Sequence, residues 1–213
     1  MKKLIAIIFG SMLLFSTHAA AELAIGVTAN FASIDTDGSE TELTGDTEKT
    51  TASVSDDVVI PEVFVEAVNE NGLAFGVSYI PSRELGNKKR TDSDGDDAAE
   101  NDDGDYTAKA DLSNVLMVYT DIPIGPIYVK LGFQRAEILT KELLDDTVQY
   151  EDAHVNGYTA GIGYRGNLGD AFYKLEVAYT DFDEYKDTSD SGTATVAAET
   201  EITSVRASLG FAF

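Results

Sequence analysis

The amino-acid sequence predicts an all-β fold, an eight-stranded antiparallel up-and-down transmembrane β-barrel. Three observations lead to this prediction. Eight segments of the chain alternate apolar with small or polar side chains, which is the two-residue period of a β-strand. The connections between these segments alternate between long and short. After the N-terminal 21 residues, no segment approaches the ~18 apolar residues that a membrane helix needs.

Residues 1–21 have the pattern of a secretory signal peptide. Lys2 and Lys3 precede a short apolar run, and small residues ending at Ala21 follow it. We therefore expect cleavage after Ala21 and a mature barrel domain of residues 22–213. A retained membrane helix is the alternative, and the shortness of the apolar run disfavours it. The sequence contains no cysteine, so no disulfide framework or thiolate chemistry is expected.

The first four predicted strands span residues 22–33, 57–68, 72–81 and 109–120. One face of each of the first three is apolar, with these rows: Leu23, Ile25, Val27, Ala29 and Phe31; Val59, Val63, Val65 and Ala67; Leu73, Phe75, Val77 and Tyr79. Pro61 lies inside the second strand, where its missing N–H predicts a bulge or a local break. The fourth strand is apolar on both faces over its second half, so its two sides cannot be assigned.

The last four predicted strands span residues 127–139, 153–165, 171–182 and 204–213. Their apolar rows are as follows: Ile127, Val129, Leu131 and Phe133; Tyr158, Ala160, Ile162 and Tyr164; Ala171, Tyr173, Leu175, Val177 and Tyr179; Val205, Ala207, Leu209, Phe211 and Phe213. Strands of about ten alternating residues are typical of membrane barrels, whose lipid-facing and lumen-facing side chains alternate. We expect an interfacial girdle from the tyrosines near strand ends: Tyr79, Tyr119, Tyr158, Tyr164, Tyr173 and Tyr179.

The connections predict the orientation of the barrel. Long connections cover residues 34–56, 82–108, 140–152 and 183–198, and short ones cover 69–71, 121–126 and 166–170. Membrane barrels have short periplasmic turns and longer extracellular loops. An even number of strands then places both termini on the periplasmic side. The sequence therefore predicts a protein of the bacterial outer membrane with its long loops outside the cell.

The chain is strongly acidic. Its formal charge is −23, and loss of Lys2 and Lys3 with the signal peptide makes it more negative still. Nucleic-acid binding requires basic patches, so we exclude nucleic acid as a partner. The exposed parts suit water rich in cations.

The C-terminal segment "SVRASLGFAF" carries a resemblance to a known family. Together with the signal peptide and the eight alternating segments, it resembles the small outer-membrane barrels of the OmpX type and the membrane domain of OmpA. The resemblance implies that Phe213, with Phe211 upstream, ends a strand recognised by the barrel-assembly machinery. It also implies outer-membrane lipid and lipopolysaccharide as surroundings, and a monomer. It covers essentially the whole mature chain.

If the apolar face of each strand meets lipid, the opposite face lines the lumen. The predicted lumen residues are Glu62, Glu66, Lys130, Gln134, Lys174, Glu176 and Arg206. Buried charges are tolerated when they are paired, so the favoured interpretation is a salt-bridged plug that makes the barrel rigid. The alternative is a narrow water-filled channel, gated as Arg206 and Lys130 exchange partners among the three glutamates.

The second long connection is an acidic run that partly resembles a calcium-binding loop. Its candidate ligands are Asp92, Asp94, Asp96, Glu100 and Asp103. The calcium-loop pattern needs glycine at position six and glutamate at position twelve, whereas this chain has Asp97 and Asp103 there. We therefore favour a solvated acidic loop with diffuse counterions. No cofactor is expected, and Ca²⁺ at this loop is the alternative.

Catalytic motifs are lacking. His154 is the only histidine of the mature chain, and Val155 and Asn156 follow it, so the local His-x-Ser arrangement of outer-membrane lipid A deacylases is absent. We therefore expect no enzymatic activity and no catalytic residues. The favoured function is structural and surface-interactive, with a role in envelope integrity or adhesion through acidic extracellular loops. A small cation-preferring, porin-like channel is the second hypothesis, and a soluble periplasmic ligand-binding barrel is the third.

Overall fold

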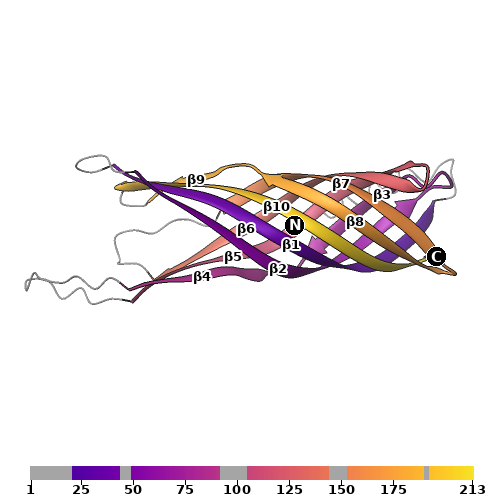
Figure 1. Ribbon diagram of the computed structural model, residues 1–213, viewed down its shortest axis with the longest axis horizontal. Helices are drawn as coiled ribbons and strands as arrows, with labels where there is room; N and C mark the ends of the chain where they lie inside the picture. The colour runs from indigo at the N-terminus through magenta and orange to yellow at the C-terminus, as the bar shows by residue number, and fades with distance from the viewer. Residues whose placement is uncertain (1–20, 44–48, 92–104, 144–152, 190–191) are drawn as a thin grey trace, which may run out of the picture.

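The computed structural model describes residues 21–43, 49–91, 105–143, 153–189 and 192–213, and its strands form one closed antiparallel sheet (Figure 1). The strands run in this order: β1 Glu22–Glu42, β2 Lys49–Val68, β3 Ala74–Ile80, β4 Arg83–Thr91, β5 Asp105–Ile124, β6 Ile127–Leu143, β7 Ala153–Leu168, β8 Ala171–Phe182, β9 Tyr185–Thr188 and β10 Ala194–Ala212. No helix among the described residues has the length and apolar composition needed to cross a membrane.

Eight of these strands close the ring. The pairing order is β1-β2-β3-β5-β6-β7-β8-β10, and β10 pairs with β1 to complete it. The remaining two strands, β4 and β9, extend the ring outward, because β4 pairs with β5 beyond the end of β3 and β9 pairs with β10 beyond the end of β8. The predicted all-β, eight-stranded antiparallel up-and-down barrel is confirmed.

Several strands are longer than the sequence predicts. Most of the predicted long connection 34–56 belongs to β1 and β2, which pair from Glu22↔Val68 to Thr41↔Lys49. Likewise, β10 begins at Ala194, inside the predicted connection 183–198. The alternation of apolar residues ends near Ser33 because a strand outside a membrane needs no lipid-facing side. The backbone ladder continues there with serine, threonine and acidic residues.

The short connections are tight turns that gather at one end of the barrel, where the C-terminus also lies (Figure 1). Gly125 and Gly169 have φ angles of 63° and 70°, a conformation that glycine adopts without steric cost. The predicted turn 121–126 is too long, because β5 continues to Ile124 and includes Asp121.

The structure decides two points about strand irregularities that the sequence leaves open, the first being whether Pro61 makes a bulge or a local break. Pro61 causes no bulge, since it lies opposite Ala29 in an unbroken register with β1. The ladder between β2 and β3 starts only at Val63, so a break lies on that side. In β5, the register shifts between Ser113 and Leu116. This irregularity at Asn114 explains why the alternation of the fourth predicted strand could not be assigned to sides.

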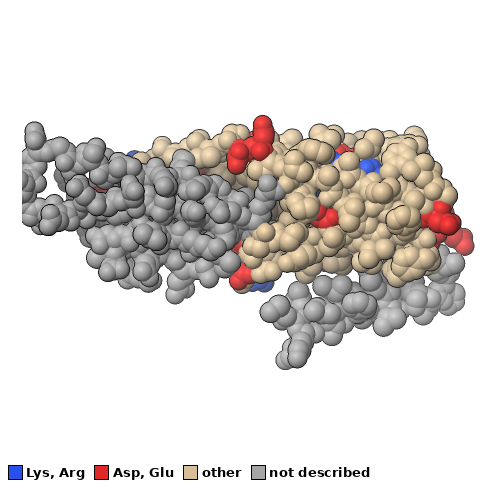
Figure 2. Space-filling view, turned by 90° about the horizontal axis from the view of Figure 1, so that it is seen from below, with Lys and Arg blue, Asp and Glu red and all other residues tan. Residues whose placement is uncertain are grey.

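The outer surface carries an apolar belt next to the short-turn end. On β1 the exposed row runs from Leu23 to Phe31, and at the C-terminus it runs from Phe213 back to Val205. Such a row covers about 9–11 residues, the length of a tilted membrane-crossing strand. Figure 2 shows few charged side chains on this part of the described surface. A face of this kind would be unstable in water and fits a transmembrane barrel.

The lumen is filled by side chains. An apolar cluster lies toward the long connections and consists of Ala32, Ile34, Ile60, Val115, Ala136, Val155, Phe182 and Ile202. A smaller one nearer the short-turn end consists of Ala24, Phe64 and Phe172. Charged and polar side chains lie at the inward positions between and among these clusters, with exposures of 8% or less.

Candidate functional site

The candidate site is a continuous chain of ion pairs across the lumen. Eight charged side chains alternate in sign along it, in this order: Glu62, Arg206, Glu176, Lys130, Asp121, Lys174, Glu66 and Arg165. They come from β2, β5, β6, β7, β8 and β10. The chain begins at Glu62 on β2 and ends at Arg165 on β7, and its four acids balance its four bases.

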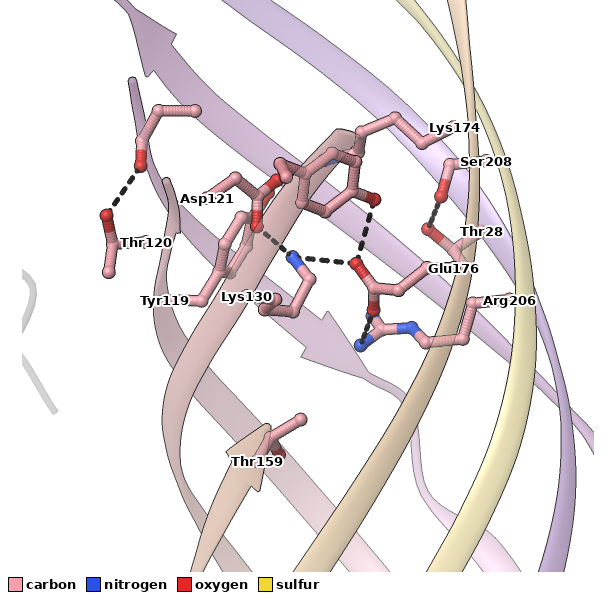
Figure 3. Close-up of polar contacts among 12 residues, drawn as sticks. Thr28, Tyr119, Thr120, Asp121, Lys130, Thr159, Lys174, Glu176, Arg206 and Ser208 are labelled. Carbon is pink, nitrogen blue, oxygen red and sulfur yellow. Dashed lines mark hydrogen bonds and ion pairs between the residues drawn. The ribbon is translucent and has the colours of Figure 1, made fainter. Parts of the chain in front are cut away.

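Arg206 joins the first two carboxylates, and Figure 3 shows its contact with Glu176. Its Nη2 donates to both oxygens of Glu62, at 2.6 and 2.5 Å. Its Nη1 lies 3.0 Å from Oε1 of Glu176. A guanidinium can hold two carboxylates at once because its donors are fixed in a planar fork. Removal of Arg206 would therefore leave two buried carboxylates without this partner.

The two lysines continue the chain around Asp121. Lys130 Nζ lies 2.7 Å from Oδ1 of Asp121 and 3.4 Å from Oε2 of Glu176. Lys174 Nζ lies 3.0 Å from the other oxygen of Asp121 and 2.7 Å from Glu66 Oε2. The Lys130 side chain is 2% exposed and Glu66 is 0% exposed. Charges buried this deeply are stable only when they are paired on all sides.

Arg165 closes the chain near the short-turn end. It forms an ion pair with Glu66, and its guanidinium carbon lies 3.7 Å above the centre of the Phe172 ring. With a side chain 23% exposed, it is the most accessible cation of the chain. A cation over an aromatic face is attracted by the ring quadrupole, so this ring helps to hold Arg165 in place.

Two tyrosines complete the hydrogen bonding of the carboxylates. Tyr119 donates to Glu66 and Tyr128 donates to Glu176, each at 2.9 Å. The ring of Tyr119 also lies 3.5 Å below the ammonium of Lys130. Tyr119 therefore points into the lumen. The sequence-based prediction that it belongs to the interfacial girdle is wrong. The shift in β5 explains the error, because alternation could not be followed through that strand.

The structure brings six of the seven predicted lumen residues into the chain: Glu62, Glu66, Lys130, Lys174, Glu176 and Arg206. Gln134 is also buried, but it lies opposite Met117 and Gly157, outside the ion pairs. Sequence reasoning missed Asp121, which had been placed in a turn. It also missed Arg165, although an alternation continued by two residues beyond Gly163 would have marked it as inward-facing.

The other predicted sites have different positions. Phe211 and Phe213 are exposed at the end of the apolar belt, at 57% and 72%. The acidic residues 92–103 lie outside the described residues. Within the described part of the chain, no group of three or more His, Asp or Glu side chains could hold a metal ion. His154 is exposed and lines a rim cavity of about 230 Å³ with Glu184 and Lys186.

In the part of the barrel near the short turns, each large inward-facing aromatic residue lies directly opposite a glycine on a neighbouring strand. The pairs are Phe64 with Gly26, Tyr119 with Gly76, Tyr128 with Gly163, and Phe172 with Gly210. A Cβ added at any of these glycines would collide with the facing ring. The glycines therefore provide the space into which the rings fold, and this arrangement brings the tyrosine hydroxyls to the carboxylates.

We expect Gly76→Val to destabilise the barrel by about 1–3 kcal/mol, the usual cost of overpacking a filled core. The new side chain would displace the Tyr119 ring and its hydrogen bond to Glu66. Urea unfolding of the lipid-embedded protein, followed by heat-modifiable gel mobility, measures the effect. Gly38→Val is the matched control, because a Cβ there meets only ordinary contacts, the nearest at 3.6 Å. Equal midpoints for the two variants would refute the packing argument.

No family model matches the chain, and no curated protein matches it. Among solved structures, the chain is similar to the outer membrane protease OmpT from Escherichia coli, with 11% identity over 90% of this chain and 97% of that chain and a TM-score of 0.45. It is also similar to Neisserial surface protein A, with 12% identity over 89% of this chain and 99% of that chain and a TM-score of 0.40. A third similar structure is the outer membrane protein AlkL, with 12% identity over 93% of this chain and 92% of that chain and a TM-score of 0.47.

These identities and TM-scores carry no information on activity. The closed ring of eight strands, the exposed apolar belt and the buried charges define the fold by themselves. The chain is an eight-stranded antiparallel transmembrane β-barrel.

Proposed function

We propose that this protein is an occluded outer-membrane barrel that presents acidic extracellular structure, with a role in envelope integrity or adhesion. The observation that carries the proposal is the alternating chain of eight charges that crosses the lumen. Its members hold one another in a fixed arrangement, and apolar clusters lie toward both ends of the barrel. A lumen filled in this way supports a rigid anchor more than an aqueous channel.

Electrostatics support the same proposal. The chain of ion pairs has no net charge, so it offers a permeating ion no excess of either sign. The acidic residues of the long strands lie instead at the opposite end from the short turns, on the outer parts of β1, β2 and β10, such as Asp35, Asp57 and Glu201. We place this end outside the cell and both termini in the periplasm, following the short-turn rule for membrane barrels.

The partners follow from this placement. The apolar belt contacts membrane lipid, and the acidic end meets the lipopolysaccharide layer and its counterions. The C-terminal strand, ending in Phe213, is the recognition element for the barrel-assembly machinery. The protein carries out no catalysis in this proposal, and it needs no cofactor.

We expect the purified protein to show no steady open events in planar lipid bilayers. The expected reason is that ions would have to displace several paired charges at once. Reconstituted protein is measured at both voltage polarities, and Glu62→Gln and Arg206→Met serve as comparison variants that break one link of the chain. Steady conductance of the unmodified protein that disappears when Arg206 is removed would overturn the proposal in favour of a cation-preferring channel.

A further inference from the structure

Over residues 49–57, one edge of β2 has no strand partner among the described residues. The strand pairs with β1 along its whole length, but its ladder with β3 covers only residues 63–68. The next strand along the wall, β4, pairs with β5. Figure 1 shows the β1–β2 hairpin and the β4–β5 hairpin diverging toward the end with the long connections.

Between Lys49 and Asp56, the open edge lacks the usual protection against strand addition. Residues 49–57 are all exposed, and six consecutive residues of this edge, 50–55, are threonine, alanine, serine or valine without proline or charge. Natural edge strands are normally blocked by charges, proline or bulges. The β1 ladder is also regular here, so the backbone of β2 stays extended. An extended peptide could therefore pair with this edge.

The charges of the neighbouring strands determine which peptide would fit. On the outer face, Asp35 lies directly opposite Glu201, and Asp37 lies directly opposite Glu199. Like charges placed opposite each other destabilise a sheet. On β2, the residues opposite Asp35 and Asp37 are the small Ser55 and Ser53.

A peptide strand added to β2 would be two strand spacings, about 10 Å, from the aspartates of β1. Lysine or arginine side chains are long enough to reach across the intervening serines. Ser53 already donates a 2.5 Å hydrogen bond to Asp37, so its side chain is turned toward β1 and leaves the approach to the edge open. A cation at every second position would offset the two rows of like charge.

We propose that the edge of β2 over residues 49–57 binds an extended basic polypeptide by strand addition. Backbone hydrogen bonds to the open edge give the affinity, and the acidic rows of β1 and β10 select lysine or arginine on alternate positions. The inference goes beyond the proposed function, because it concerns the wall outside the belt and does not depend on the lumen.

The test uses the full mature protein folded in detergent micelles and a fluorescent ten-residue peptide that alternates lysine with threonine. Fluorescence anisotropy measures binding. A peptide of the same sequence with methylated backbone nitrogens keeps the charge but cannot pair, and we expect it to bind at least about tenfold more weakly. The corresponding glutamate peptide should not bind. Equal binding of the methylated peptide, or no binding of the lysine peptide, would overturn the inference.

Protein variants locate the contact. Successive N–H groups of a strand point to opposite edges. One of the variants Ala52→Pro and Ser53→Pro therefore removes an N–H group from the ladder with β1. The other removes only an N–H group of the open edge. The second of these should fold, as shown by heat-modifiable mobility, and lose peptide binding. Asp35→Asn with Asp37→Asn should weaken the lysine peptide without affecting folding. Unchanged affinity for the lysine peptide in all folded variants would refute the proposed site. The proposal of an occluded lumen is tested separately, by conductance in planar bilayers, and would still stand if these variants conduct no ions.

Discussion

Arg206→Met is expected to destabilise the folded barrel by about 3–5 kcal/mol, the cost of breaking a buried ion pair by removing one partner. The guanidinium of Arg206 contacts both Glu62 and Glu176, and neither carboxylate has water access to replace it. Methionine fills similar space, so the loss reflects charge more than cavity formation. The prediction is measured as the urea unfolding midpoint in lipid vesicles, followed by heat-modifiable mobility.

Two further variants separate the electrostatic effect from a general one. Lys49→Met removes an exposed cation from the outer part of β2 and should change stability by no more than about 0.5 kcal/mol, as for surface substitutions. Adding Glu62→Gln to Arg206→Met should recover part of the loss, because one uncompensated carboxylate is then neutral. If Arg206→Met were no more destabilising than Lys49→Met, the ion-pair chain would not support the barrel.

Deletion of Phe213 is expected to impair assembly in the outer membrane far more than deletion of residues 92–105. Phe213 and Leu23 exchange two backbone hydrogen bonds, of 2.9 and 3.2 Å, at the seam where β10 meets β1. Pairing at this seam closes the ring of strands within the membrane belt, where an unpaired strand edge would be costly. The exposed aromatic side chain of Phe213 also ends the apolar row that we propose as the assembly signal.

The measurement is the folded fraction in outer-membrane preparations, again by heat-modifiable mobility, with periplasmic accumulation as the complement. Phe213→Tyr is the matched control, because it keeps an aromatic ring and both backbone bonds, and it should assemble nearly normally. Equal losses for the Phe213 and the 92–105 deletions would contradict this division between an assembly element and a dispensable connection.

Sequence alternation was sufficient to locate the strands within the membrane belt. In β1, β6, β7 and β10 the predicted outward rows are exposed or half-buried, and the predicted inward residues are buried or half-buried. Alternation works there because lipid requires apolar side chains on one face only. Where both faces meet water, as at residues 34–42 of β1, the same backbone ladder leaves no such trace, so the strand ends were predicted too early.

Pairwise chemistry inside the barrel was less accessible to the sequence. The inward positions of Lys130, Lys174 and Arg206 follow from alternation, but the partners of each cation depend on strand order and register. Asp121 illustrates this, since its position between two lysines depends on the shift at Asn114 and on the turn at Gly125. A displacement by one residue would have turned its carboxylate toward lipid.

The sequence by itself determined a chain of eight alternating strands, an apolar outward face and a set of opposite charges for the interior, because local periodicity records which environment each side chain meets. Only the tertiary structure decided that these charges form one neutral chain and that glycines accommodate the inward aromatic rings. It also decided that, among the described residues, β2 pairs with β3 only over residues 63–68. These features join residues up to 144 positions apart. Closure of the ring sets which of them meet, and no local pattern contains that information.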